Sequence, residues 1–150
     1  MTTGPVRHQR VLDSCVEPEC LDRIHQLLAE LWIADGGIAE IDRMLFETAV
    51  IEVAGNVVRH RRSPNGFRCW VTLGVYDTAL EAVFRDTADA LDPAAVEPVL
   101  ERAAEVWPDE TAEHGRGLAL ARSMVDELSY QRFDGVNQSV SLDELQEPAG

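Results

Sequence analysis

Two stretches decide the fold of this chain, Glu52-Val53-Ala54-Gly55-Asn56 and Glu113-His114-Gly115-Arg116-Gly117-Leu118-Ala119-Leu120. The first lies inside a long segment whose apolar residues recur at helical spacing, and the second is a glycine-rich turn that opens another such segment. Between them, Val83-Phe84-Arg85-Asp86 is a strand-like run that ends in an acid. This order predicts a helix carrying a carboxylate and an amide, a strand ending in an aspartate, and a glycine loop before a further helix.

Apolar spacing along the rest of the chain predicts about five strands and three main helices. Strands are expected at 9–15, 67–76, 80–85, 128–133 and 136–142, and helices at 20–32, 38–60 and 117–126. The last two strands form a hairpin about Asp134-Gly135. Because helices and strands are each grouped along the chain, we expect an α+β fold with a mixed, mostly antiparallel sheet backed by the helices. Residues 1–150 are expected to form one domain, with its core at about 8–143.

The composition excludes several classes of function. The chain has 13 basic and 27 acidic residues, a net charge of −14, which disfavours direct binding of nucleic acid. All 13 basic residues are arginines, so a Walker A phosphate loop is excluded, since that motif needs a lysine. No apolar run approaches the ~20 residues that span a bilayer, and the first residues lack a signal-peptide core. We therefore expect a cytoplasmic protein.

Glu52 and Asn56 share one face of the expected helix because they lie four residues apart. Together with His60 they fall within an arc of about 80° that borders the apolar stripe. Such residues can reach a ligand at the rim of the core, although a polar pair at this spacing is also common on a solvated face. His60 is equally compatible with a cation that caps the end of the helix.

The glycine-rich turn Gly115-Arg116-Gly117 directly precedes the apolar run that begins at Leu118. Backbone N–H groups at a helix start bind anions, and glycines let the chain approach phosphate oxygens closely. Arg116 adds a charge-assisted donor. A plain junction between a loop and a helix has the same short pattern, so the turn is informative mainly through its order with the other motifs.

Taken together, these motifs resemble the N, G1 and G2 boxes of the GHKL ATP-binding superfamily, and within it the bacterial anti-sigma-factor serine/threonine kinases. The resemblance covers nearly the whole chain and implies a two-layer sandwich that binds ATP and Mg²⁺. It implies that Asn56 ligates the metal and that Glu52 lies near the γ-phosphate as a base for the attacking hydroxyl. It also implies that Asp86 accepts a hydrogen bond from adenine.

The same resemblance assigns further nucleotide contacts. His60 matches a histidine one turn after the family asparagine, and the phosphate cradle corresponds to Gly115, Arg116, Gly117 and Leu118. The middle box departs from the family pattern Asp-x-Gly-x-Gly, because Ala88 and Ala90 stand where the family has glycine. A left-handed backbone at either alanine costs roughly 1–2 kcal/mol, and this cost would weaken the binding of ATP.

Three functions are consistent with this pattern. The first is an anti-sigma-factor-type kinase that phosphorylates a STAS-type antagonist protein, sequesters a sigma factor and is able to pair as a homodimer. The second is a regulatory binding module on the same fold that binds nucleotide weakly or not at all, which Ala88 and Ala90 favour. The third is the ATPase domain of a sensor kinase. An enzyme is favoured, since Glu52, Asn56 and the glycine loop are all present.

Overall fold

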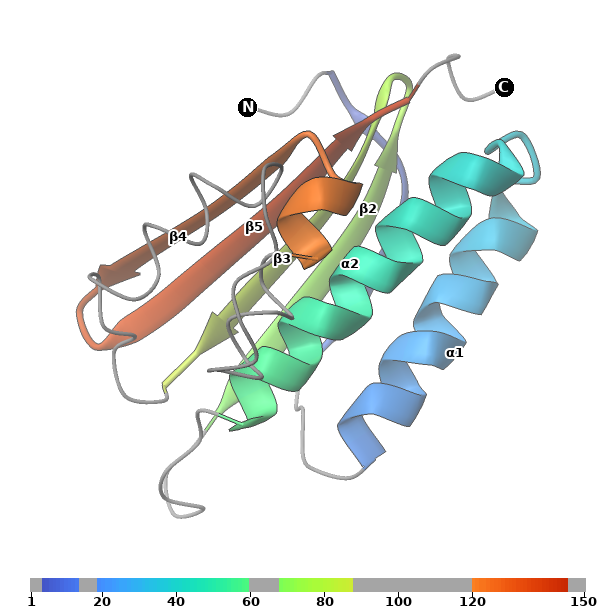
Figure 1. Ribbon diagram of the computed structural model, residues 1–150. Coiled ribbons are helices and arrows are strands. Elements are labelled where there is room, and N and C mark those ends of the chain that lie inside the picture. Colours follow the sequence, from blue (N-terminus) through green and yellow to red (C-terminus); the bar gives the residue numbers. More distant parts are fainter. Residues whose placement is uncertain (1–3, 14–18, 60–67, 88–119, 146–150) are drawn as a thin grey trace.

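The computed structural model describes residues 4–13, 19–59, 68–87 and 120–145 (Figure 1). Its two long helices are α1 (Glu19–Ala34) and α2 (Glu40–Arg59), which confirm the predicted helices to within two residues at each end. Both have acidic residues in the first turn, where the positive end of the helix dipole favours them. The third predicted helix is described at residues 120–124, and its earlier residues lie outside the described ranges. Of the described helices, none has both the length and the apolar character needed to cross a membrane.

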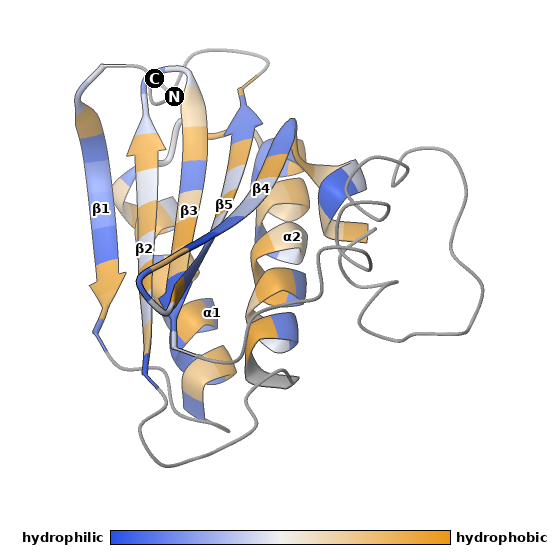
Figure 2. Cartoon of the chain, turned by 90° about the vertical axis from the view of Figure 1, so that its left-hand side faces the viewer, coloured by the Kyte–Doolittle hydropathy of each residue, from blue (hydrophilic) through white to orange (hydrophobic). Residues whose placement is uncertain are grey.

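Five strands form one sheet: β1 (Val6–Leu12), β2 (Cys69–Tyr76), β3 (Ala79–Asp86), β4 (Glu127–Phe133) and β5 (Val136–Glu144). They lie in the order β1-β2-β3-β5-β4, and each neighbouring pair is antiparallel (Figure 2). The α1 and α2 helices and the segment at 120–124 lie on one side of this sheet (Figure 1). The predicted α+β sandwich, with a sheet of five strands backed by three helices, is therefore confirmed.

The sequence predicts the tight turn between β4 and β5 correctly, but not the bounds of the edge strand β1. The β4–β5 turn is confirmed, since Asp134 and Gly135 have φ of 52° and 77°, as a two-residue turn of this hairpin requires. The predicted strand at 9–15 is wrong in its bounds, because β1 begins at Val6 and ends at Leu12. Its register pairs Val6 with Tyr76 and Leu12 with Val71, so the extent of this edge strand follows its partner β2.

The core lies between the sheet and the two long helices. Fully buried side chains come from both layers, including Leu28 of α1, Phe46 of α2 and Phe84 of β3. α1 packs against β1 and β2, whereas α2 packs against β3 and β5. Burial of apolar surface, worth roughly 25 cal/mol per Å², is what fixes these contacts. It also places α2 over the central strands.

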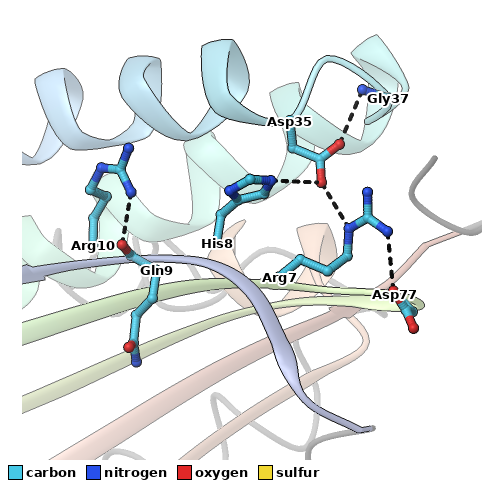
Figure 3. Close-up of polar contacts among 7 residues, drawn as sticks. All are labelled: Arg7, His8, Gln9, Arg10, Asp35, Gly37 and Asp77. Atoms are coloured by element: carbon cyan, nitrogen blue, oxygen red, sulfur yellow. Dashed lines mark hydrogen bonds and ion pairs between the residues drawn. The ribbon is translucent and has the colours of Figure 1, made fainter.

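Asp35 ties the edge strand β1 to the connection between the two helices (Figure 3). Its buried carboxylate accepts hydrogen bonds from Arg7 Nε at 3.0 Å and from the Gly37 N–H at 3.2 Å, with His8 Nε2 at 3.6 Å. Arg7 also donates to Asp77 in the β2–β3 turn at 3.2 Å. These carboxylates, and the Asp35 hydrogen bond most of all, raise the pKa of Arg7. One buried acid thus links three segments that are distant in sequence.

A second group of acids lies where β5, α2 and the start of β4 meet. Asp143 and Asp42 are nearly fully buried, and Oδ2 of each has no hydrogen-bond partner among the described residues. Burial raises the pKa of Asp143 to about 7, with Asp126, Asp42 and Glu144 adding to the rise. Within the described ranges, no group of three or more His, Cys, Asp or Glu side chains is arranged to hold a metal ion. Asp143 therefore keeps a proton to near-neutral pH.

This raised pKa predicts that stability declines as the pH rises through the acid range to about 7. The unfolded chain releases the proton near pH 3.8 and the folded chain only near 7, so the folded state binds more protons in between. Asp143→Asn should flatten this dependence and exceed the wild type in stability above about pH 7. Denaturant unfolding across this range measures the effect, with Glu127→Gln, at an exposed glutamate that does not contribute to the raised pKa of Asp143, as the control. Equal pH profiles for Asp143→Asn and the wild type would contradict the assignment.

Candidate functional site

The C-terminal half of α2 carries two of the predicted site residues. Asn56 is only 4% exposed, and its buried Oδ1 has no hydrogen-bond partner among the described residues. Glu52, one helical turn earlier on the same face, is half-buried. An unpaired buried acceptor costs about 1–3 kcal/mol, so such an atom in a folded protein requires an explanation. A cation or a donor on a ligand would satisfy it.

Asp86 is the last residue of β3, as the sequence predicts for a strand that ends in an acid. The structure adds that this residue is buried. Its Oδ1 accepts a hydrogen bond from Asn137 Nδ2 of β5 at 2.9 Å. On its other side it pairs with Cys69 of β2. Burial, with the charge of Asp86 adding to it, raises the pKa of the Cys69 thiol to about 12. Cys69 is therefore a neutral thiol beside a buried carboxylate.

The fold brings the amide and the aspartate to one end of the molecule. The C-terminal ends of α2 and β3 lie at the same end in Figures 1 and 2, and α2 packs against β3. Asn56 and Asp86 thus stand on neighbouring elements, as their sequence order suggested. The other predicted contacts, at His60, Gly115, Arg116, Gly117 and Leu118, lie outside the described residues, as do Ala88 and Ala90.

Sequence reasoning missed the residues on β4 and β5 that surround Asp86. Asn137 is buried, and its Oδ1 accepts hydrogen bonds from the Tyr130 hydroxyl and from Arg132 Nη1. The Asp134-Gly135 turn does predict that Arg132 and Asn137 face each other in a hairpin. The pairing of β5 with β3, however, has no local signal, so the link to Asp86 was not predictable.

An antiparallel sheet backed by helices on one face, with a buried amide on the central helix and an aspartate at the end of a central strand, defines an ATPase-type sandwich. The sequence matches the family described as "Histidine kinase-like ATPase domain" over residues 16–143. The chain therefore belongs to the histidine kinase-like ATPase domain family. Among curated proteins, none matches the sequence.

Solved structures with the same fold support this assignment of architecture. The RsbU and RsbW domains of Rv1364c from Mycobacterium tuberculosis match 95% of this chain with a TM-score of 0.64 and 18% identity. The present chain spans only 34% of that structure. The mycobacterial sensor histidine kinase MprB matches 94% of this chain and 99% of its own, with a TM-score of 0.54 and 18% identity. The catalytic domain of histidine kinase ThkA matches over the same shares, with a TM-score of 0.54 and 9% identity.

Two buried asparagines give a matched test of the unpaired oxygen. Asn56→Leu should raise the free energy of unfolding of the ligand-free protein by about 1 kcal/mol, because it removes an unsatisfied acceptor. Asn137→Leu should lower it by about 1–3 kcal/mol, because it strips Asp86 of a donor. Denaturant unfolding measures both. A loss of stability in Asn56→Leu similar to that in Asn137→Leu would show that Asn56 is a structural residue.

Proposed function

We propose that this chain is an anti-sigma-factor-type serine/threonine kinase that uses Mg-ATP to phosphorylate a STAS-type antagonist and otherwise sequesters a sigma factor. Membership of the ATPase family supports the nucleotide, and the RsbW domain in a structure of the same fold is consistent with the sigma-factor system. The observation that carries the proposal is the buried Oδ1 of Asn56, which has no hydrogen-bond partner within the part of the chain that the structure describes. We further propose that residues 1–150 are a single cytoplasmic domain able to pair as a homodimer.

In this proposal Asn56 and Asp86 bind different parts of the nucleotide complex, Asn56 the metal and Asp86 the base. Mg²⁺ takes few protein ligands and prefers oxygen, so a single rigid amide oxygen beside phosphate oxygens suits it. The Asn56 side chain has such an oxygen available. Asp86 accepts a hydrogen bond from the adenine amino group. Gly115, Arg116, Gly117 and Leu118 hold the phosphates, and His60 contributes at the end of α2.

Glu52 is the proposed base. It lies one turn before Asn56 on α2 and is half-buried, so it can face a substrate beside the metal ligand. In the reaction the serine oxygen forms a bond to the γ-phosphorus while the bond to the β–γ bridging oxygen breaks and ADP leaves. The hydroxyl proton passes to the Glu52 carboxylate. Mg²⁺ supplies neutralisation of the phosphate charge.

A nucleotide-weak binding module is the second candidate, and Ala88 and Ala90 favour it. If these positions require a left-handed backbone, the two alanines together reduce the affinity for ATP by very roughly ten- to a thousandfold. Such a module would hold its protein partner through surface contacts and perform no chemistry. Affinity for nucleotide separates the two candidates.

Calorimetric titration of ATP with and without Mg²⁺ tests the proposal. We expect Mg²⁺-dependent binding in the micromolar range, about −8 kcal/mol, for the wild type. The binding of ATP by Asn56→Leu should no longer depend on Mg²⁺, since this variant lacks the amide oxygen that would ligate the metal. Folded protein that releases no heat up to millimolar ATP would refute the kinase and support the binding module.

Replacement of Glu52 separates binding from chemistry. Glu52→Gln should retain ATP affinity within about twofold while phosphotransfer to a serine-bearing STAS protein falls by about two orders of magnitude or more. Transfer of radiolabelled γ-phosphate measures this loss. Glu40→Gln, an exposed glutamate at the opposite end of α2, is the matched control and should transfer phosphate normally. Unchanged phosphate transfer by Glu52→Gln would show that Glu52 is not the general base.

A further inference from the structure

A row of polar residues crosses four strands of the sheet at one register. Cys69 of β2 pairs with Asp86 of β3, Asp86 pairs with Asn137 of β5, and Asn137 pairs with Arg132 of β4. Cys69, Asp86 and Asn137 are each at most 3% exposed. Tyr130, two residues before Arg132, also reaches Asn137. Side chains that face one another in this way interact directly across strands.

The hydrogen bonds of Asn137 fix the orientation of its amide. Its Oδ1 accepts from two donors, the Tyr130 hydroxyl and Arg132 Nη1, the latter at 2.8 Å. Tyr130 has one O–H and Arg132 has donors only, so a flipped amide would direct its NH₂ group at the Arg132 guanidinium. The NH₂ group is thereby directed at Asp86, to which Nδ2 donates at 2.9 Å.

This arrangement has a consequence for Asp86. Oδ1 of Asp86 is held as an acceptor by a donor that cannot turn away, so the plane of the carboxylate is fixed at the end of β3. The Arg132 guanidinium polarises the Asn137 amide, which strengthens the hydrogen bond that Nδ2 donates to Asp86. A fixed carboxylate binds an amino group and repels a carbonyl oxygen at the same position.

We propose that Asn137, oriented by Tyr130 and Arg132, is a positioning residue that makes Asp86 select a purine with an exocyclic amino group over one with a carbonyl there. The inference rests on the proposed nucleotide site and adds to it the residues that set base selectivity. Asn137 acts through Asp86, whereas Tyr130 and Arg132 act one step further away.

Calorimetry with ATP and with inosine triphosphate tests this, because hypoxanthine has a carbonyl in place of the adenine amino group, and an N–H in place of the adjacent ring acceptor N1. The wild type should prefer ATP by about tenfold or more. Asn137→Asp replaces the amide donor to Asp86 by an acceptor. It should reduce the preference for ATP over inosine triphosphate to about twofold, because only the binding of ATP becomes weaker. Gln138→Glu makes the same change one residue further on, where the side chain accepts from Arg85, and should keep the full preference.

Two further variants, Tyr130→Phe and Arg132→Gln, test the inference even if Asn137→Asp fails to fold. Both should fold, since Arg132 is exposed and Tyr130 is only half-buried. Arg132→Gln removes the guanidinium that opposes a turned Asn137 amide and should lower the preference for ATP several-fold, whereas Tyr130→Phe removes one of the two donors to Oδ1 and should lower it less. Inosine triphosphate should bind as before in both. An equal loss for both nucleotides, or an unchanged preference in all three variants, would overturn the inference while leaving the kinase proposal intact. A wild type that binds neither nucleotide would instead refute the proposed function, and the inference with it.

Discussion

The packing of α2 against β3 and β5 is the contact on which the site depends. Phe46, Val50 and Val53 are fully buried beneath the helix, and this apolar row holds α2 over the centre of the sheet. Asn56 continues the same buried face at the C-terminal end, so its amide enters the core together with its apolar neighbours. A polar group is thus buried because the rest of the helix is. Apolar packing offsets the cost of its Oδ1, which has no partner among residues 4–13, 19–59, 68–87 and 120–145.

Three buried aspartates show three ways in which this acidic chain accommodates a carboxylate in its interior. Asp35 is paired with Arg7, which is a charged partner at hydrogen-bond distance. Asp86 accepts a hydrogen bond from the Asn137 amide, which is a neutral donor. Burial, to which acidic neighbours add, raises the pKa of Asp143 to about 7, so this carboxyl retains its proton to near-neutral pH. An ionised carboxylate without a partner would be far more costly to bury, and each solution avoids it.

The difference between these aspartates bears on function. Asp35 links backbone segments, and its contacts are satisfied by the protein itself (Figure 3). Asp86 lies at the end of a central strand, where the Asn137 amide donates to its Oδ1 and orients the carboxylate. Residues that position an acid can therefore matter as much to recognition as the acid.

Residue spacing along the chain was enough to predict most of the helices and strands, the tight β4–β5 turn and the shared face of Glu52 and Asn56, because all of these depend on separations of a few residues. The motif order also pointed to Asp86 and to the ATPase family. The contact between Asn137 and Asp86, 51 residues apart, follows from the packing of the sheet, since it requires β5 to insert beside β3. It likewise decided the bounds of β1 and the burial of the Asn56 oxygen. Strand partners and buried surroundings are set by the packing of whole layers, which no local pattern of residues encodes.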